Sequence, residues 1–197
     1  MQQTQVKELL IQSLEHERGG IQVYETALKC AANDDLKEEW QKYLGQTRNH
    51  ERILLSVFQQ LSLDPEEDSF GRQVVKSLGA ALVGAMQTAL KAGDGAAAEL
   101  VACECVVLAE TKDHADWELI SKCAQKATGK QHTVLQSACD EVEEQEDEHL
   151  YNSKGWCREL WMKSLGMRAV LPPPEERKHV TTAIGAARAE QASEKGR

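Results

Sequence analysis

Apolar side chains recur along most of this chain at the three- and four-residue spacing of an α-helix. Four long segments carry such a stripe: about residues 4–31, 35–61, 96–126 and 130–165. Short breaks join the first segment to the second and the third to the fourth, and short links favour antiparallel neighbours. The pattern therefore predicts an all-α protein that contains two antiparallel helical hairpins.

The two predicted hairpins are separated by a longer connection, residues 62–95. Its middle, Arg72 to Lys91, is rich in Ala, Gly, Leu and Val and predicts an extra helix. Gly79 and Gly84 have no side chain to hold a neighbour away, so they indicate a close contact between helices. We expect a four-helix bundle whose hairpins are joined by a crossover that contains this extra helix.

The last part of the chain differs from the rest. Pro172, Pro173 and Pro174 stop the fourth stripe, and a polar, Ala-rich segment follows. We therefore expect a helical bundle over residues 1–170 and a flexible C-terminal tail over residues 171–197. A chain of 197 residues is long enough for one domain with a sizeable core.

Composition excludes several classes of protein. The net charge is -9 with no compensating basic patch, which argues against nucleic acid as a partner. No stretch reaches the roughly 18 apolar residues of a membrane-spanning helix, so we expect no membrane partner. The N-terminus lacks the pattern of a signal peptide, and the six cysteines form no C-x-x-C pair. Buried, reduced cysteines and a cytoplasmic location are the simplest expectation.

Each apolar stripe is interrupted near its middle by polar side chains. These are Glu17 in the first segment, Thr47 and His50 in the second, Glu110 and His114 in the third, and Glu146 and His149 in the fourth. A buried carboxylate costs several kcal/mol unless it is neutralised or coordinated. Carboxylate oxygens with a few imidazoles are ligands typical of iron or manganese. The sequence therefore predicts a metal site in one polar layer of the bundle.

Each of these residues also has a plainer interpretation. Taken alone, Glu17 is also explained as a partly exposed flank residue, His50 as a hydrogen-bonded core histidine, and Glu110 as a member of a salt-bridge cluster with Asp113 and His114. Glu146 lies within residues 140–149, which hold seven carboxylates and no Lys or Arg. In so acidic a run, chance alone would place one carboxylate on the core face. Their coincidence at similar heights in all four segments favours the metal site.

A weak internal repeat relates the two hairpins. A shift of 93 residues superposes Glu17 on Glu110 and Tyr24 on Trp117. A shift of 99 residues superposes Thr47 on Glu146 and His50 on His149. The repeat predicts a site with two similar halves, because the matched positions include the polar residues of the stripes.

These residues resemble the ligand pattern of the ferritin-like superfamily, in particular its rubrerythrin-like and bacterial stress-response branches. The resemblance covers about residues 4–165 and is carried by Glu17 followed by Tyr24, by Glu110, and by the Glu146-x-x-His149 pair. It implies a non-haem iron or manganese protein with O₂- or peroxide-linked oxidoreductase activity in stress defence. It identifies no substrate.

The resemblance also implies a ligand set and a catalytic residue. The metal ligands are Glu17, His50, Glu110, Glu146 and His149, with Asp113 or His114 as further candidates. Tyr24 is the candidate catalytic residue, as an electron donor or as a hydrogen-bond donor to a ligand. The chain lacks the Cys-x-x-Cys pairs of the rubredoxin-type centre found in full rubrerythrins.

The second segment departs from the family pattern. Thr47 stands where the family places a glutamate three residues before the histidine, and threonine is a poor ligand. The site is then expected to bind one metal, to bind two weakly, or to be empty. A metal-free helical scaffold or stress protein is therefore the alternative function. A third is a binding module, whose apolar pocket or dimer face would be lined by the small-residue connection 71–92 and by Trp40, Trp117, Trp156 and Trp161. Amphipathic helices make a homodimer the expected partner.

Overall fold

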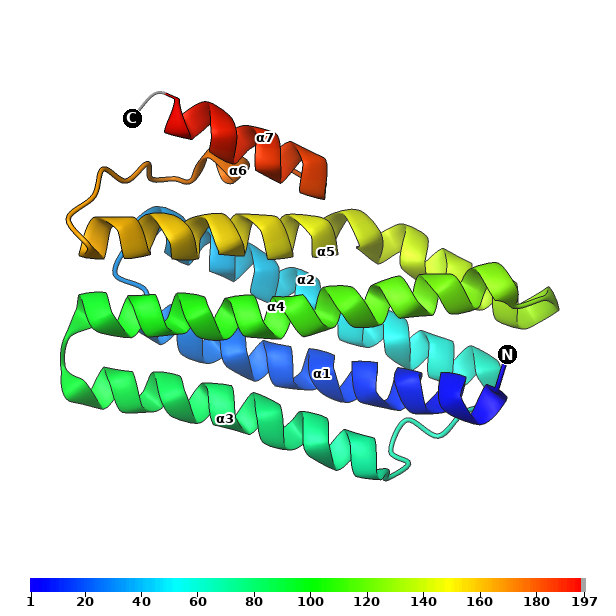
Figure 1. Ribbon diagram of the computed structural model, residues 1–197. Coiled ribbons are helices and arrows are strands. Elements are labelled where there is room, and N and C mark those ends of the chain that lie inside the picture. The colour runs from blue at the N-terminus through cyan, green and yellow to red at the C-terminus, as the bar shows by residue number, and fades with distance from the viewer. Residues whose placement is uncertain (196–197) are drawn as a thin grey trace.

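The computed structural model describes residues 1–195, and this part of the chain contains seven helices and no strand (Figure 1). The helices are α1 (Gln3–Cys30), α2 (Asp34–Leu61), α3 (Phe70–Ala92), α4 (Gly95–Lys126), α5 (Gly129–Ser164), α6 (Pro174–Arg177) and α7 (Ala183–Glu194). The predicted all-α class is confirmed. The five predicted helices begin and end within two residues of the observed ones.

Local hydrogen bonds explain where the helices begin and end. The side chains of Asn33, Ser69 and Asp94 accept bonds from backbone N–H groups at the starts of α2, α3 and α4. The residues that follow α2 and α3, Ser62 and Gly93, both have positive φ angles of the left-handed region. These short breaks turn the chain back on itself.

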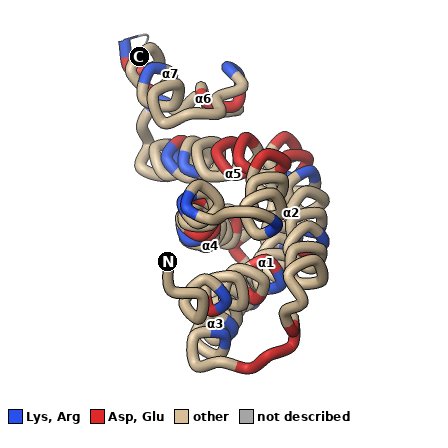
Figure 2. The backbone as a smooth tube through the Cα atoms, turned by 90° about the vertical axis from the view of Figure 1, so that its right-hand side faces the viewer, with Lys and Arg blue, Asp and Glu red and all other residues tan. Residues whose placement is uncertain are grey.

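Helices α1 and α2 pack together, as do α4 and α5, and the two pairs contact each other through α1 with α4 and through α2 with α5. Helix α3 covers α1 and α4 from outside (Figures 1 and 2). A Cβ atom added to Gly79 of α3 would lie 3.5 Å from the Cα of Gly19 in α1. The close helix contact predicted at Gly79 is therefore confirmed.

Two apolar clusters occupy opposite ends of the helical body. One includes Tyr24, Trp40 and Trp156, and the other includes Leu14, Phe58 and Trp117. In α1, α2, α4 and α5 the side chains between the two clusters are polar and buried. The fold therefore excludes water from a polar layer at the middle of the four longest helices.

The segment after residue 170 carries two helices that pack against α5. Arg158 of α5 forms ion pairs with Glu175 at 2.7 Å and Glu159 at 3.1 Å, and Trp156 Nε1 donates to Glu176 Oε2 at 2.5 Å. Gly155 leaves room for this docking, because an added Cβ would lie 2.6 Å from Glu175 Oε2. The division into a bundle and a flexible tail at residue 170 stays a prediction.

Two further properties bear on the sequence predictions. All six cysteines are free, and four of them are buried. Among the described residues, no helix combines the length and apolar character that a membrane crossing requires.

Candidate metal centre

The polar layer brings together side chains from the two hairpins. Its members are Glu17 of α1, His50 of α2, Glu110 and Asp113 of α4, and Glu146 and His149 of α5, each at most 4% exposed. Because each helix supplies apolar residues above and below this level, the polar side chains have no route to bulk water along their own helix. Ligand atoms of five of these residues form two overlapping groups within which every pair lies within 4.8 Å.

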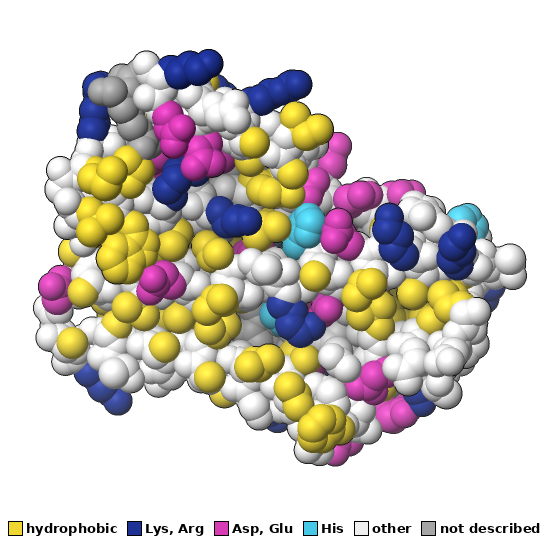
Figure 3. Space-filling view, viewed as in Figure 1, with side chains coloured by type: hydrophobic (Ala, Val, Ile, Leu, Met, Phe, Trp, Pro, Cys, Tyr) yellow, Lys and Arg dark blue, Asp and Glu magenta, His cyan; other side chains and the backbone are white. Residues whose placement is uncertain are grey.

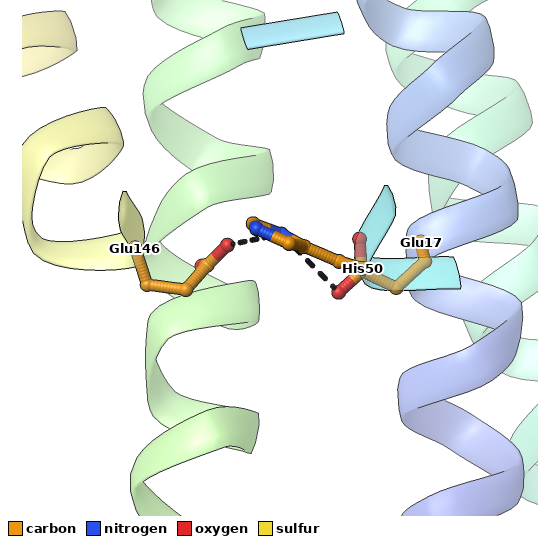
Figure 4. A group of neighbouring side chains, drawn as sticks. All are labelled: Glu17, His50 and Glu146. Atoms are coloured by element: carbon orange, nitrogen blue, oxygen red, sulfur yellow. Dashed lines mark ion pairs between the residues drawn. The ribbon is translucent and has the colours of Figure 1, made fainter. Parts of the chain in front are cut away.

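The first group contains Glu17, His50 and Glu146 (Figure 4). His50 Nδ1 lies 3.0 Å from Glu146 Oε1 and 3.9 Å from Glu17 Oε1. Figure 4 shows the imidazole between the two carboxylates, which reach it from opposite sides of the layer.

The second group contains Glu110, Glu146 and His149. His149 Nδ1 lies 3.4 Å from Glu110 Oε2 and 3.8 Å from Glu146 Oε1. Glu146 belongs to both groups, so it stands between the two histidines. The sequence places Glu146 and His149 on one face of α5, and the structure shows that this face points into the layer.

The outer nitrogens of both histidines are held by glutamine side chains. His50 Nε2 lies 2.9 Å from Gln145 Oε1, and His149 Nε2 lies 2.9 Å from Gln46 Oε1. An amide oxygen only accepts, so each Nε2 carries the proton and donates it. In its neutral form each ring therefore presents the lone pair of Nδ1 to the layer. This is the arrangement in which a histidine binds a metal ion.

The terminal carboxylates are also held from outside the layer. Trp117 Nε1 donates to Glu17 Oε1 at 2.9 Å, and the Tyr24 hydroxyl donates to Glu110 Oε1 at 2.7 Å. Tyr24 follows Glu17 by seven residues, and Trp117 follows Glu110 by seven. Each aromatic side chain donates its hydrogen bond to the glutamate of the other hairpin. The sequence repeat thus has a structural counterpart in reciprocal hydrogen bonds.

Seven buried atoms of the layer have no hydrogen-bond partner within the described residues. They are Glu17 Oε2, His50 Nδ1, Glu110 Oε2, Asp113 Oδ1, Glu146 Oε1 and Oε2, and His149 Nδ1. All are acceptors when the carboxyls are ionised, and buried acceptors without a partner are costly. Two ligands at right angles, each about 2.1 Å from an octahedral ion, are about 3.0 Å apart. The separation of His50 Nδ1 and Glu146 Oε1 fits such a pair.

Burial and mutual repulsion shift the carboxyl pKa values in this layer. Burial raises the pKa of Glu146 to about 8, with a further contribution from the charge of Glu110. Burial also raises the pKa values of Glu17 and Asp113 well above their ordinary range. For Glu110 burial acts in the same direction, but contacts with His149 and Tyr24 outweigh it and lower the pKa. Without a cation, burial therefore favours the protonated forms of Glu17, Asp113 and Glu146, but not that of Glu110.

Two candidate ligands lie apart from these groups. Asp113 is buried in the layer but belongs to neither group. His114 turns toward the surface, where its Nε2 lies 2.6 Å from Asp147 Oδ1. The predicted clustering of Glu17, His50, Glu110, Glu146 and His149 is thus seen in the structure, whereas His114 is not brought to them. Their roles as metal ligands stay predictions.

Thr47 occupies the position at which the sequence resemblance leads us to expect a carboxylate. Its hydroxyl donates to the backbone oxygen of Tyr43 at 2.9 Å, which leaves only its methyl group near α1. A Cβ added to Gly20 would lie 3.3 Å from that methyl group.

Sequence reasoning missed the partners of the histidines. Gln46 and Gln145 each precede a candidate histidine by four residues, which places both on the same helix face as that histidine. The repeat contained this signal, because Gln46 and Gln145 are also related by a shift of 99. The cross-pairing between hairpins follows only from the packing of α2 against α5.

No protein-family model matches this chain, and neither a curated protein nor a solved structure was found to match it.

Proposed function

We propose that this chain is a ferritin-like protein that binds two iron or manganese ions in its polar layer. In this proposal α1, α2, α4 and α5 form a four-helix bundle, and α3 lies in the crossover between its hairpins. The helix contacts and the directions of the helices in Figure 1 support this arrangement. The free cysteines suit a reducing compartment such as the cytoplasm.

The observation that carries the proposal is the convergence of buried acceptor atoms without partners. Glu17 and His50 would hold one ion, Glu110 and His149 the other, and Glu146 would be shared. A cation satisfies these atoms at once and removes the repulsion between the carboxylates. Neutral histidines and carboxylate oxygens, without a thiolate among the grouped ligands, favour iron or manganese.

We further propose an oxidoreductase activity toward O₂ or peroxide in stress defence. Bound iron would supply the redox chemistry. Tyr24 would orient Glu110 through its hydrogen bond or donate an electron. Burial raises the pKa of Tyr24 well above its ordinary value, so this hydroxyl stays protonated and keeps donating.

Thr47 supports a second candidate function, a metal-free helical scaffold that retains the bundle. A bridging carboxylate at this position would complete the second half of the site, and threonine does not replace it. The layer would then be kept neutral by protons rather than by metal ions.

Equilibrium metal analysis distinguishes the two candidates. Chelated protein is incubated anaerobically with Fe²⁺ or Mn²⁺, desalted and analysed for bound metal. The proposed function predicts about two ions per chain and near-complete loss of both in Glu146→Gln, because Glu146 belongs to both groups. Glu144→Gln is the matched control, since Glu144 lies on the same helix and is exposed. Wild-type protein without bound metal would favour the scaffold.

A further inference from the structure

A pocket of about 240 Å³ opens between α4, α5 and the start of α7. Glu118 and Ser121 of α4 and Glu143 and Asp147 of α5 lie on its walls, and Thr182 and Ala183 lie at its C-terminal side. In Figure 3 a histidine and acidic side chains lie side by side on this face, below the right-hand end of α7. The pocket is distinct from the ligand groups, but it reaches one of their members.

That member is Glu146, which lines the pocket while only 2% of its surface is exposed. Neither of its carboxylate oxygens has a hydrogen-bond partner within the described residues. Glu146 is also the residue shared by the two ligand groups. The inner end of the pocket therefore adjoins the proposed metal centre.

The charge of the pocket selects cations. Its lining includes four carboxylic residues, Glu118, Glu143, Glu146 and Asp147, and neither Lys nor Arg. These residues belong to the acidic run of α5 and the facing side of α4, and Figure 2 shows the run as a continuous acidic stretch. A cleft lined by one sign of charge concentrates the opposite ion and speeds its capture.

The size of the pocket suits a hydrated ion. Six water molecules at about 30 Å³ each occupy about 180 Å³. A pocket of about 240 Å³ can therefore receive a divalent ion that still carries its first hydration shell. Removing that shell requires ligands between the surface and the metal centre.

His114 and Asp147 are placed for this exchange. Their side chains, 17% and 24% exposed, pair at 2.6 Å on the wall of the pocket. Asp147 immediately follows Glu146 in α5, so one turn of helix presents carboxylates to both the pocket and the centre. An ion can thus exchange its bound water molecules for carboxylate oxygens in two steps, first at Asp147 and then at Glu146.

We propose that this pocket is the entry port for the divalent metal ion, with Asp147 as a transient ligand before Glu146. The proposal rests on the proposed function, since it needs a metal centre at the inner end. Glu118, Glu143 and Asp147 belong to neither ligand group, and the proposal gives them a role in the rate of metal uptake.

Stopped-flow measurement of Mn²⁺ or Fe²⁺ uptake by chelated protein tests the port. Glu143→Gln and Glu118→Gln should each slow uptake, by about 3- to 10-fold at low salt, because each removes a steering charge. Raising the salt concentration should slow metal uptake by the wild type and reduce the difference in uptake rate between the wild type and these variants. Glu144→Gln, which removes an exposed charge on α5 outside the pocket lining, should leave the rate unchanged.

Ser121→Trp places a bulky side chain in the lining of the pocket, so it tests whether ions pass through the pocket without changing its charge. It should slow uptake more than either Gln variant while the final number of bound ions stays at the wild-type value. Unchanged uptake rates in Ser121→Trp and Glu143→Gln would overturn the port. If the wild type binds no ion at equilibrium, the proposed function itself has failed, and the two outcomes are therefore distinguishable.

Discussion

Thr47 of α2 stands where Glu146 stands in α5, three residues before the histidine of its helix. Glu146 directs two oxygens into the polar layer, whereas the hydroxyl of Thr47 donates to its own helix at Tyr43. The two halves of the centre therefore share histidines, glutamines and terminal glutamates but differ in one carboxylate. The first prediction concerns that difference.

Thr47→Glu should strengthen metal binding by restoring the carboxylate. Thr47 is 2% exposed and its methyl group packs near Gly20 of α1, so the longer side chain enters the layer only if neighbouring side chains adjust. We expect binding of the weaker ion to tighten by about tenfold, the scale on which single residues around a metal site change its affinity. In chelator the same variant should lower the free energy of unfolding by about 1–3 kcal/mol, because it adds an unpaired buried carboxyl.

The matched control for this variant is Thr111→Glu. Thr111 is exposed and its hydroxyl also donates to the backbone four residues earlier, at Val107. Metal titration followed by urea unfolding of both variants separates a local effect from added charge. Equal metal affinity in Thr47→Glu and Thr111→Glu would contradict the ligand role of position 47.

Gln46→Ala should weaken the ion held by His149. The amide oxygen fixes the ring with Nδ1 facing the layer, so its loss frees both the ring orientation and the tautomer. We expect the metal affinity to fall by about 10- to 100-fold. Gln41→Ala, an exposed change on the same helix, is the control, and isothermal titration measures both. An unaltered affinity in Gln46→Ala would show that the glutamine has no positioning role.

The metal-free protein should lose stability as the pH rises from 7 to 8. Glu146 has a folded pKa of about 8, above its unfolded value near 4.5, so the folded state binds the extra proton. Its contribution to stability is full at low pH and is lost as the pH rises through 8. The expected loss from Glu146 alone is about 1 kcal/mol between pH 7 and 8.

Urea unfolding in chelator at the two pH values measures this loss, and metal-loaded protein should not show it. His16 has a lowered pKa because of burial, so its own stability change occurs at lower pH and is largely complete by pH 7. A metal-free protein that is equally stable at pH 7 and pH 8 would contradict the raised pKa of Glu146.

Glu146→Gln should have opposite effects on the free energy of unfolding with and without metal. In chelator at pH 8 the variant avoids the cost of ionising a buried carboxyl, so its stability should equal or exceed that of the wild type. With saturating Mn²⁺ the wild type should be the more stable, since only it gains the binding free energy. Thermal unfolding under both conditions gives the comparison. A variant at least as stable as the wild type under both conditions would favour the metal-free scaffold.

The sequence was informative wherever a property depends on one helix. The short break between the first two stripes predicted where α1 ends and α2 begins, and the structure shows Asn33 capping α2 in that break. The spacing of Glu146 and His149 predicted that both lie on one face. Properties that depend on packing between helices could not be predicted from the sequence pattern. Nothing in the pattern near His114 shows that this side chain pairs with Asp147 at the surface instead of entering the layer.

The same limit applies to the end of the chain. Three prolines and an Ala-rich composition predicted that the helix stops, but the docking of the following segment depends on tertiary contacts. Gly155 and Arg158 of α5 supply the space and the charge that receive Glu175. The periodicity of a single helix predicts neither the contact of Gly155 with Glu175 nor that of Arg158 with Glu175, because the partners belong to different helices.

Anomalous diffraction from crystals loaded with Mn²⁺ or Fe²⁺ tests whether the polar layer binds two metal ions. We expect two peaks in this layer. One lies between Glu17, His50 and Glu146, and the other between Glu110, His149 and Glu146. Loaded crystals without a peak in this layer, with carboxyls and imidazoles bonded only to each other or to water, would contradict this expectation.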